Sequence, residues 1–262
     1  MEEFEDLLLE ADNLRFDGKV ENAVKKYLSI ASSANGQGES TVAARAFQLA
    51  ASSLIMTISS QTVATYRDAL AMLTKAKNIY IGVHDETGLG ACLREEAVAA
   101  AKMGAKSEAI ELFTEAIETL SRRDSFEELG ITYSKYGLWL SRWGDSQGGL
   151  AQIEQALSTL RKVPVAGLNN TIVLFDQAKV LSASEQLEPA LALALEAKSW
   201  FEADHPDQNY TLPIAEISGF LSVLYRSRGE QVAAERCWKV FSQALPTFDP
   251  LLSRSLQTEV DQ

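Results

Sequence analysis

The chain is poor in residues that interrupt or cross-link a polypeptide: its 262 residues include 6 prolines, 15 glycines and 2 cysteines. Long disordered linkers are therefore unexpected. Cys92 and Cys237 cannot form a disulfide framework for a chain of this length, and neither belongs to a CxxC pair, so we expect structural thiols in a reducing cytoplasm. No apolar run reaches the roughly 18 residues of a membrane span. The opening MEEFEDLLLE lacks the basic start of a secretory signal.

Positive charge is also scarce, since 24 lysines and arginines stand against 36 aspartates and glutamates, for a net charge of −12. Nucleic acids and anionic lipids take most of their affinity from basic protein surfaces. The composition therefore argues against general binding to either, although it leaves room for a local basic patch. The simplest role of the excess negative charge is solubility.

Catalytic motifs are missing as well. The only histidines, His84 and His205, fall at expected loops without a cysteine or carboxylate at metal-ligand spacing. The chain has no GxxxxGK[ST], GxGxxG, HExxH or GxSxG motif. The run GDSQGG at 144–149 differs from the serine-protease loop GDSGG by an inserted glutamine and has no nearby histidine. We therefore expect no catalytic residues, no bound metal and no cofactor, and a protein that is not an enzyme.

Helical periodicity dominates what is present, and alternating strand patterns are nearly absent. Glycine, proline and Asx-containing breaks separate the periodic segments, among them Asn35-Gly36, Pro164, His205-Pro206 and Pro246. The sequence predicts an all-α protein with helices at about 2–16, 20–34, 40–58, 62–81, 87–103, 106–121, 126–143, 146–161, 168–183, 187–203, 210–228, 230–244 and 249–260.

These helices repeat in pairs. The segments KMGAKSEAIELFTEAIETL (102–120) and RWGDSQGGLAQIEQALSTL (142–160) align on Gly104 and Gly144. Counting from this turn residue t, small residues recur at t−7, t+5 and t+12, and bulky residues at t−11, t−4 and t+9. The same frame fits with t at 18, 185 and 229, and a sixth copy that shows only its second half puts t near Ala64.

This frame resembles the tetratricopeptide repeat (TPR), in a variant with a period of 40 or more residues instead of 34 and without most of the prolines that end a standard repeat. The resemblance implies a right-handed α-solenoid of about six antiparallel helical hairpins in a single domain over residues 1–262. The hairpins would be 2–36, 39–82, 87–122, 126–162, 168–204 and 210–245, with a cap at 248–262. An irregular helical bundle whose alanine spacing mimics repeats is the alternative.

The repeat pattern is clearest in the stretch TYSKYGLWLSRWGD (132–145), where a glycine interrupts an otherwise aromatic helix. Gly137 falls at t−7, where the two helices of a hairpin cross, and Gly149 falls at the facing t+5. We expect these glycines to face each other in a close crossing, with Gly144 in the turn.

The concave face of such a solenoid binds peptides or partner helices. In the TPR frame its groove-facing positions are t−13, t−10, t−6, t−3 and t−2. In the five clear repeats these positions hold three carboxylates, Glu5, Asp12 and Glu216, and twice as many cations. We therefore predict a locally basic groove that binds an acidic segment; the alternative is that these cations pair with neighbouring carboxylates. The predicted partner-binding residues are Arg15, Arg94, Lys102, Arg142, Lys179, Arg226, Phe175 and Leu138.

The resulting hypothesis is a cytoplasmic, non-enzymatic scaffold or adaptor within a larger protein complex. A clamp for chaperone tails would need asparagine at t−6, which no clear repeat has. The runs ACLREEAV (91–98) and VAAERCW (232–238) resemble segments of the soluble NSF-attachment proteins, especially the gamma type, which would imply an adaptor of membrane fusion. A peptide-sensing regulatory domain is a further alternative.

The segment PTFDPLLSRSLQTEVDQ (246–262) is expected to form a capping helix over the last hairpin. In that case Leu251, Leu252 and Leu256 would cover Trp238 and Phe241. The alternative is that the end of the last hairpin stays open as a dimer interface.

Overall fold

A computed structural model describes residues 2–58, 62–163, 167–203, 205 and 208–261. The predicted breaks at Pro164 and Pro206 lie outside the described residues. Over the described ranges, each predicted helix is present with ends that differ by at most two residues from the prediction. The thirteen α-helices of this part are α1 (Glu2–Phe16), α2 (Val20–Gly36), α3 (Ser40–Met56), α4 (Val63–Gly82), α5 (Glu86–Lys102), α6 (Lys106–Ser121), α7 (Phe126–Arg142), α8 (Ser146–Leu160), α9 (Gly167–Ala183), α10 (Leu187–Glu202), α11 (Thr211–Ser227), α12 (Gln231–Ala244) and α13 (Pro250–Asp261), and one 3₁₀ turn, η1 (Leu245–Thr247), follows α12.

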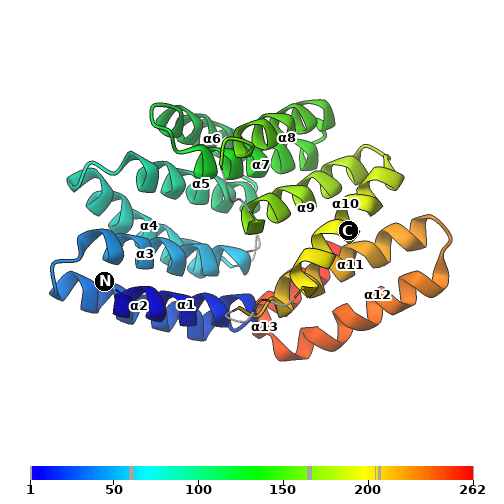
Figure 1. Ribbon diagram of the computed structural model, residues 1–262, viewed down its shortest axis with the longest axis horizontal. Coiled ribbons are helices and arrows are strands. Elements are labelled where there is room, and N and C mark those ends of the chain that lie inside the picture. Colours follow the sequence, from blue (N-terminus) through cyan, green and yellow to red (C-terminus); the bar gives the residue numbers. More distant parts are fainter. Residues whose placement is uncertain (1, 59–61, 164–166, 204, 206–207, 262) are drawn as a thin grey trace. The chain divides into compact units, whose positions relative to one another are not determined.

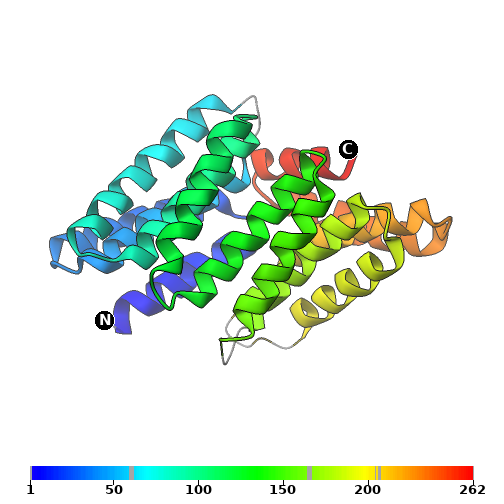
Figure 2. The ribbon, with the colours of Figure 1, turned by 90° about the horizontal axis from the view of Figure 1, so that it is seen from above.

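The helices form consecutive antiparallel hairpins, the arrangement of a TPR-like helical solenoid (Figure 1). Clustering of contacts divides the chain into two compact units. Unit 1 comprises Met1–Arg123, Asp207–Asn209 and Phe248–Gln257, and unit 2 comprises Asp124–Pro206, Tyr210–Thr247 and Thr258–Gln262. Helices α1 to α6 stack in unit 1, and α7 to α12 stack in unit 2 (Figures 1 and 2). Among the described helices, none combines the length and the apolar character needed to cross a membrane.

The hairpin turns share one hydrogen-bonded motif. The turn residue t has a positive φ in five hairpins, at Gly18, Gly104, Gly144, Glu185 and Gly229. In each of them the N–H of t+1 donates to the carbonyl of t−4, at 2.9–3.0 Å. This pattern is the Schellman motif, in which a left-handed residue lets the chain satisfy the last helical carbonyls. The predicted turns at these five positions are therefore confirmed.

The second hairpin departs from the frame. Ala64, the predicted turn residue, lies inside the first turn of α4, which begins at Val63. The turn between α3 and α4 must therefore precede residue 63, and residues 59–61 lie outside the described part. The residues that suggested this repeat are nevertheless buried, since the small Ala69 and Ala76 and the bulky Leu73 of α4 are all 0% exposed.

The crossing between α7 and α8 leaves no room for a side chain at either of its glycines. A Cβ added at Gly137 would lie 2.7 Å from the carbonyl oxygen of Gly149, and a Cβ at Gly149 would lie 2.8 Å from the carbonyl oxygen of Gly137. The two glycines therefore face each other across the hairpin as expected. Alanine fills the corresponding t−7 and t+5 positions of three other hairpins, and these alanines are fully buried: Ala11 and Ala23, Ala97 and Ala109, and Ala178 and Ala190.

In two hairpins, a second glycine lies near the end of the hairpin that is opposite the turn. Gly90 and Gly130 both fall at t−14, where an added Cβ would lie 2.5 Å and 2.6 Å from the Cγ atoms of Leu120 and Leu160 at t+16. The first hairpin reverses the sizes, with buried Phe4 at t−14 and buried Ala34 at t+16. A small side chain at t−14 is therefore paired with a large one at t+16, or the reverse, so that the summed volume fills the same space. This pairing was not predicted from the sequence.

Helix α13, expected from the sequence as a capping helix, is present, and its residues are divided between the two units. Residues 248–257 belong to unit 1, where the Phe248 ring occupies the space beside Gly18 and the Asp249 N–H donates to the Gly18 carbonyl at 3.0 Å. Leu251 is exposed, whereas Leu252 and Leu256 are buried. In unit 2, Val260 and Phe241 both adjoin Gly219. That Leu251, Leu252 and Leu256 cover Trp238 and Phe241 stays a prediction, because the three leucines belong to unit 1 and the two aromatic residues belong to unit 2.

Candidate partner-binding surfaces

The first-helix positions predicted to line a groove are distributed over both units. Unit 1 holds Arg15, Arg94 and Lys102, and unit 2 holds the other five predicted residues, Leu138, Arg142, Phe175, Lys179 and Arg226. Each unit is therefore described as a surface of its own.

In unit 1 the predicted cations are engaged within the hairpin stack. Arg15 donates to Asp12 Oδ1 from Nη2 at 2.7 Å and stacks over the Phe16 ring. Burial by itself would lower the pKa of Arg15, but Asp12 and Tyr27 outweigh that effect and raise it. Arg94, with a side chain only 8% exposed, pairs with Glu95 at 3.0 Å. These contacts order the cations inside unit 1.

Lys102 has a distinct role at the end of a neighbouring helix. Its Nζ donates to the backbone carbonyl of Met56, the last residue of α3, at 3.1 Å. A cation at the C-terminus of a helix satisfies an end carbonyl and complements the helix dipole. Lys102 therefore links the second and third hairpins of unit 1.

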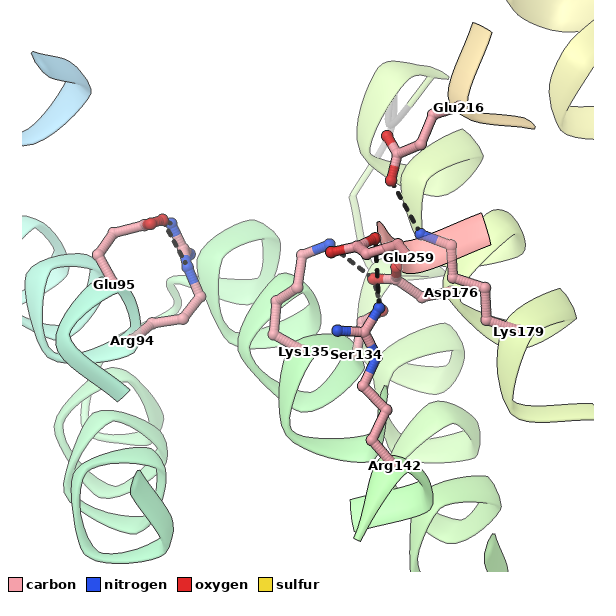
Figure 3. A network of polar contacts seen from close by, with 9 residues as sticks. All are labelled: Arg94, Glu95, Ser134, Lys135, Arg142, Asp176, Lys179, Glu216 and Glu259. Atoms are coloured by element: carbon pink, nitrogen blue, oxygen red, sulfur yellow. Dashed lines mark hydrogen bonds and ion pairs between the residues drawn. The ribbon is translucent and has the colours of Figure 1, made fainter. Parts of the chain in front are cut away.

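In unit 2 a buried carboxylate connects α7 to α9 (Figure 3). Asp176 of α9 has a side chain 3% exposed, and its Oδ2 accepts hydrogen bonds from Ser134 Oγ and Lys135 Nζ of α7, both at 2.8 Å. Burial disfavours the charged carboxylate, but Lys135, Lys179 and these hydrogen bonds outweigh burial and lower the pKa of Asp176. Asp176 is thus held ionised between two cations.

Lys179 extends the same network from α9 to α11. Its Nζ lies 3.1 Å from Glu216 Oε1 and 4.0 Å from the centre of the Phe175 ring. Phe175 in turn meets Phe220 of α11 edge to face, with ring centres 5.5 Å apart. Burial alone would lower the pKa of Lys179, yet Glu216, Asp176 and Glu259 raise it. The predicted residues Phe175 and Lys179 therefore lie together.

The two remaining cations of unit 2 are more exposed. The guanidinium of Arg142, at the end of α7, lies 5.0 Å from the centre of the Trp139 ring and 3.5 Å from Glu259 Oε2 of α13, and its side chain is 35% exposed. Arg226, at the end of α11, lies 6.0 Å from the centre of the Trp238 ring. Both arginines are held against tryptophan, a geometry that orders a cation while leaving it near solvent.

Other predicted groove positions are covered by neighbouring helices. Every t−10 position of the five clear repeats is buried: Leu8, Arg94, Ser134, Phe175 and Gly219. Leu138, at t−6, also belongs to the core with Ile153 and Val180. The t−10 positions therefore do not form an open groove, whereas none of the t−2 residues of these repeats is buried.

The sequence analysis missed Lys135 and Asp176. Both occupy t−9, one position from the residues that were considered, and they carry opposite charges in consecutive repeats. That charge alternation at one frame position is the signal that could have paired them.

The histidines and cysteines lie apart from this network. His84 adopts a positive φ between α4 and α5, and His205 Nε2 lies 2.7 Å from the Trp200 carbonyl oxygen at the end of α10. Burial raises the pKa of the thiols of both Cys92 and Cys237. Within the described residues, no group of three or more histidine, cysteine and acidic side chains is placed to hold a metal ion.

No protein-family model matches the chain, and no curated protein matches it in sequence. Solved structures do match in fold. BtubC (BKLC) from P. vanneervenii is similar with a TM-score of 0.61 and 12% identity, over 86% of this chain and 90% of that one. The quorum sensor NprR from B. thuringiensis, in its apo form, is similar with a TM-score of 0.51 and 13% identity, over 87% of this chain and 72% of that one.

A putative kinesin light chain from Podospora anserina with nearly identical TPR-like repeats gives a TM-score of 0.43 and 16% identity, over 76% of this chain and 94% of that one. Identities this low bear on the fold alone. The repeated hairpins and their shared turn motif lead to the same result: this chain has a TPR-like α-helical solenoid fold.

Proposed function

We propose that this protein is a non-enzymatic scaffold that binds an acidic peptide or helix of a partner protein on its first-helix surfaces, within a larger complex in the cytoplasm. The observation that carries the proposal is the ordered set of cations on α7, α9 and α11 of unit 2. Arg142 and Arg226 are stacked on tryptophan rings, and Lys179 is stacked on Phe175.

Pre-ordered cations favour recognition of a charged partner, because less side-chain entropy is lost when the partner binds. Their present carboxylate partners, Glu216 and Glu259, are partly exposed and can be exchanged for carboxylates of a ligand. The unit 1 cations contribute less to this proposal, since Arg94 is buried and Lys102 is bound to a backbone carbonyl.

The chemistry of the described residues supports a binding role over a catalytic one. The carboxylates and cations of unit 2 neutralise one another in a network, and neither histidine belongs to it. General acid–base catalysis needs a group whose pKa is near the working pH, whereas the shifts of Asp176 and Lys179 move both groups away from neutrality.

The test has two stages. Affinity purification followed by mass spectrometry identifies the partner, and the binding segment is then measured against Arg142→Glu combined with Lys179→Gln. We expect the affinity of this variant to be at least about tenfold lower than that of the unmodified chain, and the affinity of the unmodified chain to fall with added salt. The matched control is Arg236→Glu with Lys239→Gln, which changes two exposed cations on α12 in the same way and should bind normally. Equal affinity of both double variants would contradict the proposal.

A peptide-sensing role is a second candidate, favoured by the fold similarity to a quorum sensor. A sensor should gain thermal stability when a short peptide binds, because ligands that bind only the native state stabilise it. An adaptor resembling the soluble NSF-attachment proteins should instead bind helical SNARE bundles and stimulate a disassembly ATPase. Thermal-shift and SNARE-binding assays on the same preparation separate these candidates from a general scaffold.

A further inference from the structure

A short acidic segment of α13 lies on the cation-bearing surface of unit 2. Glu259 Oε2 is 3.5 Å from Arg142 Nη2 of α7, and Glu259 also acts electrostatically on Lys179 of α9. Next to it, the Cγ2 of Val260 occupies the space beside Gly219 of α11, where an added Cβ would lie only 2.8 Å away. Residues 258–261 therefore present the Glu259 carboxylate to α7 and α9 (Figure 3), and the Val260 side chain to α11.

Charge balance indicates what this segment supplies. The hairpins contribute three cations to the network, Lys135, Arg142 and Lys179, and two carboxylates, Asp176 and Glu216. Glu259 is the third carboxylate, and it comes from α13 and not from a hairpin. Without it, the three cations of this network would face two carboxylates.

The contact has the properties of a replaceable one. At 3.5 Å and with side chains 35% and 31% exposed, the Arg142–Glu259 pair is long and reached by solvent. Exposed ion pairs of this kind contribute little free energy. The buried Asp176 interactions, at 2.8 Å, are in contrast part of the packing between α7 and α9. A carboxylate from another molecule can therefore replace Glu259 without disturbing Asp176.

We propose that residues 258–261 are an internal competitor for the partner-binding surface of unit 2, and that the partner supplies a segment of the same chemistry, a glutamate or aspartate followed by an aliphatic residue. The carboxylate would bind between Arg142 and Lys179, and the aliphatic side chain would fill the space beside Gly219. This inference rests on the proposed function and names the chemistry of the ligand.

An internal competitor reduces the apparent affinity to the intrinsic affinity multiplied by the fraction of time that the surface is free. Because the segment is part of the same chain, its effective concentration is high, on the order of millimolar for short connections. Releasing it should therefore raise the affinity for a ligand in trans, and the size of the increase reports its occupancy.

The experiment uses the full chain and a fluorescein-labelled peptide, LQTEVDQ, which corresponds to residues 256–262. Fluorescence anisotropy gives its affinity for the unmodified chain, for Glu259→Gln with Val260→Ser, and for Glu196→Gln, a control that removes one exposed carboxylate from α10. We expect the Glu259→Gln/Val260→Ser variant to bind about three- to tenfold more tightly and the control to bind like the unmodified chain. A peptide with glutamine in place of its glutamate should lose most of the affinity, and circular dichroism verifies the fold of each variant.

Two results would overturn the inference, and they differ in what they say about the function. If the peptide binds the unmodified chain and the released variant equally, residues 258–261 do not compete for the surface, while acidic-peptide binding itself stands. If the peptide binds neither of them, the surface does not recognise an acidic–aliphatic segment, and the proposed role of Arg142 and Lys179 fails as well.

Discussion

In unit 2, Gly137 determines how closely two helices pack, and Asp176 determines where a buried charge lies. Gly137 permits a close crossing of α7 and α8, because its missing side chain leaves room for the Gly149 carbonyl. Asp176 brings a negative charge into a buried position, and it is stable there because Ser134 and Lys135 bind one of its oxygens. The first residue was evident from the sequence, since a glycine inside an aromatic helix breaks the local preference. The second was not, because a single aspartate in a helix does not reveal its partner on another helix.

Substitution of Gly137 should destabilise the fold through overpacking. An alanine Cβ would already lie 2.7 Å from the Gly149 carbonyl oxygen, so we expect Gly137→Ala to cost about 1–3 kcal/mol of unfolding free energy and Gly137→Leu more. Chemical denaturation measures both. The control is Gly82→Ala at the end of α4, where no atom lies within 4 Å of the added Cβ, and its effect should be neutral or stabilising. If Gly137→Leu is also neutral, the crossing is not as close as the structure has it.

Asp176 should make stability depend on pH. Its pKa is lowered in the folded protein from the ordinary value of 3.8, so its contribution is complete above that value and is lost as pH falls through the lower, folded pKa. At pH 6 we expect Asp176→Asn to cost about 2–4 kcal/mol, because Lys135 and Lys179 lose their buried counter-charge. Urea denaturation between pH 6 and pH 3 should show the difference from the unmodified chain shrinking toward the acid end. A difference that stays constant would contradict the assigned pKa shift.

At the scale of elements, the turn is the feature that recurs from hairpin to hairpin. Five hairpins close with the same left-handed residue and the same hydrogen bond from t+1 to t−4. Four of them use glycine, for which a positive φ costs little, whereas the hairpin of α9 and α10 uses Glu185 at φ 60°. The sequence therefore located turns well where glycine marked them. It failed at the second hairpin, where no glycine stands between α3 and α4.

The turn at Glu185 can be made more stable by a substitution. Glu185→Gly should stabilise unit 2 by about 0.5–1 kcal/mol, because glycine adopts the left-handed conformation without the steric cost that a Cβ imposes. The reverse change, Gly144→Ala at φ 90°, should destabilise by about 1 kcal/mol or more. Thermal unfolding of both variants gives the comparison, and a loss of stability in Glu185→Gly would mean that the glutamate side chain matters more than the backbone.

At the scale of the whole molecule, residues distant in sequence complete local structures. Lys19, the N-cap residue of α2, makes no side-chain capping bond. The carboxylate of Asp249 serves instead and accepts the Glu21 N–H at 2.6 Å, across 228 residues of sequence. The segment 248–257 thereby belongs to the compact unit that contains the first hairpin. A helix start that appears uncapped in the sequence is capped from the far end of the chain.

Loss of that distant cap should be measurable at the start of α2. Asp249→Ala should lower stability by about 1 kcal/mol, as for other N-cap replacements, whereas Asp249→Asn keeps an oxygen acceptor and should cost less. Hydrogen exchange at the Glu21 amide should accelerate in Asp249→Ala more than exchange in the centre of α2. Equal exchange in both variants would show that the bond contributes no protection.

The sequence by itself determined the helices, the turn positions marked by glycine and the paired small residues of each hairpin, because these follow from local conformational preference and from the volume available where two neighbouring helices cross. Only the tertiary structure decided which charges meet. Lys135 with Asp176, Lys179 with Glu216 and Arg142 with Glu259 are pairs between separate helices, 37 to 117 residues apart in the chain. Coulomb attraction depends on the distance between two charges in space and not on their separation along the chain. The sequence therefore shows where the cations lie in the repeat, but it does not show which carboxylates of other helices they meet.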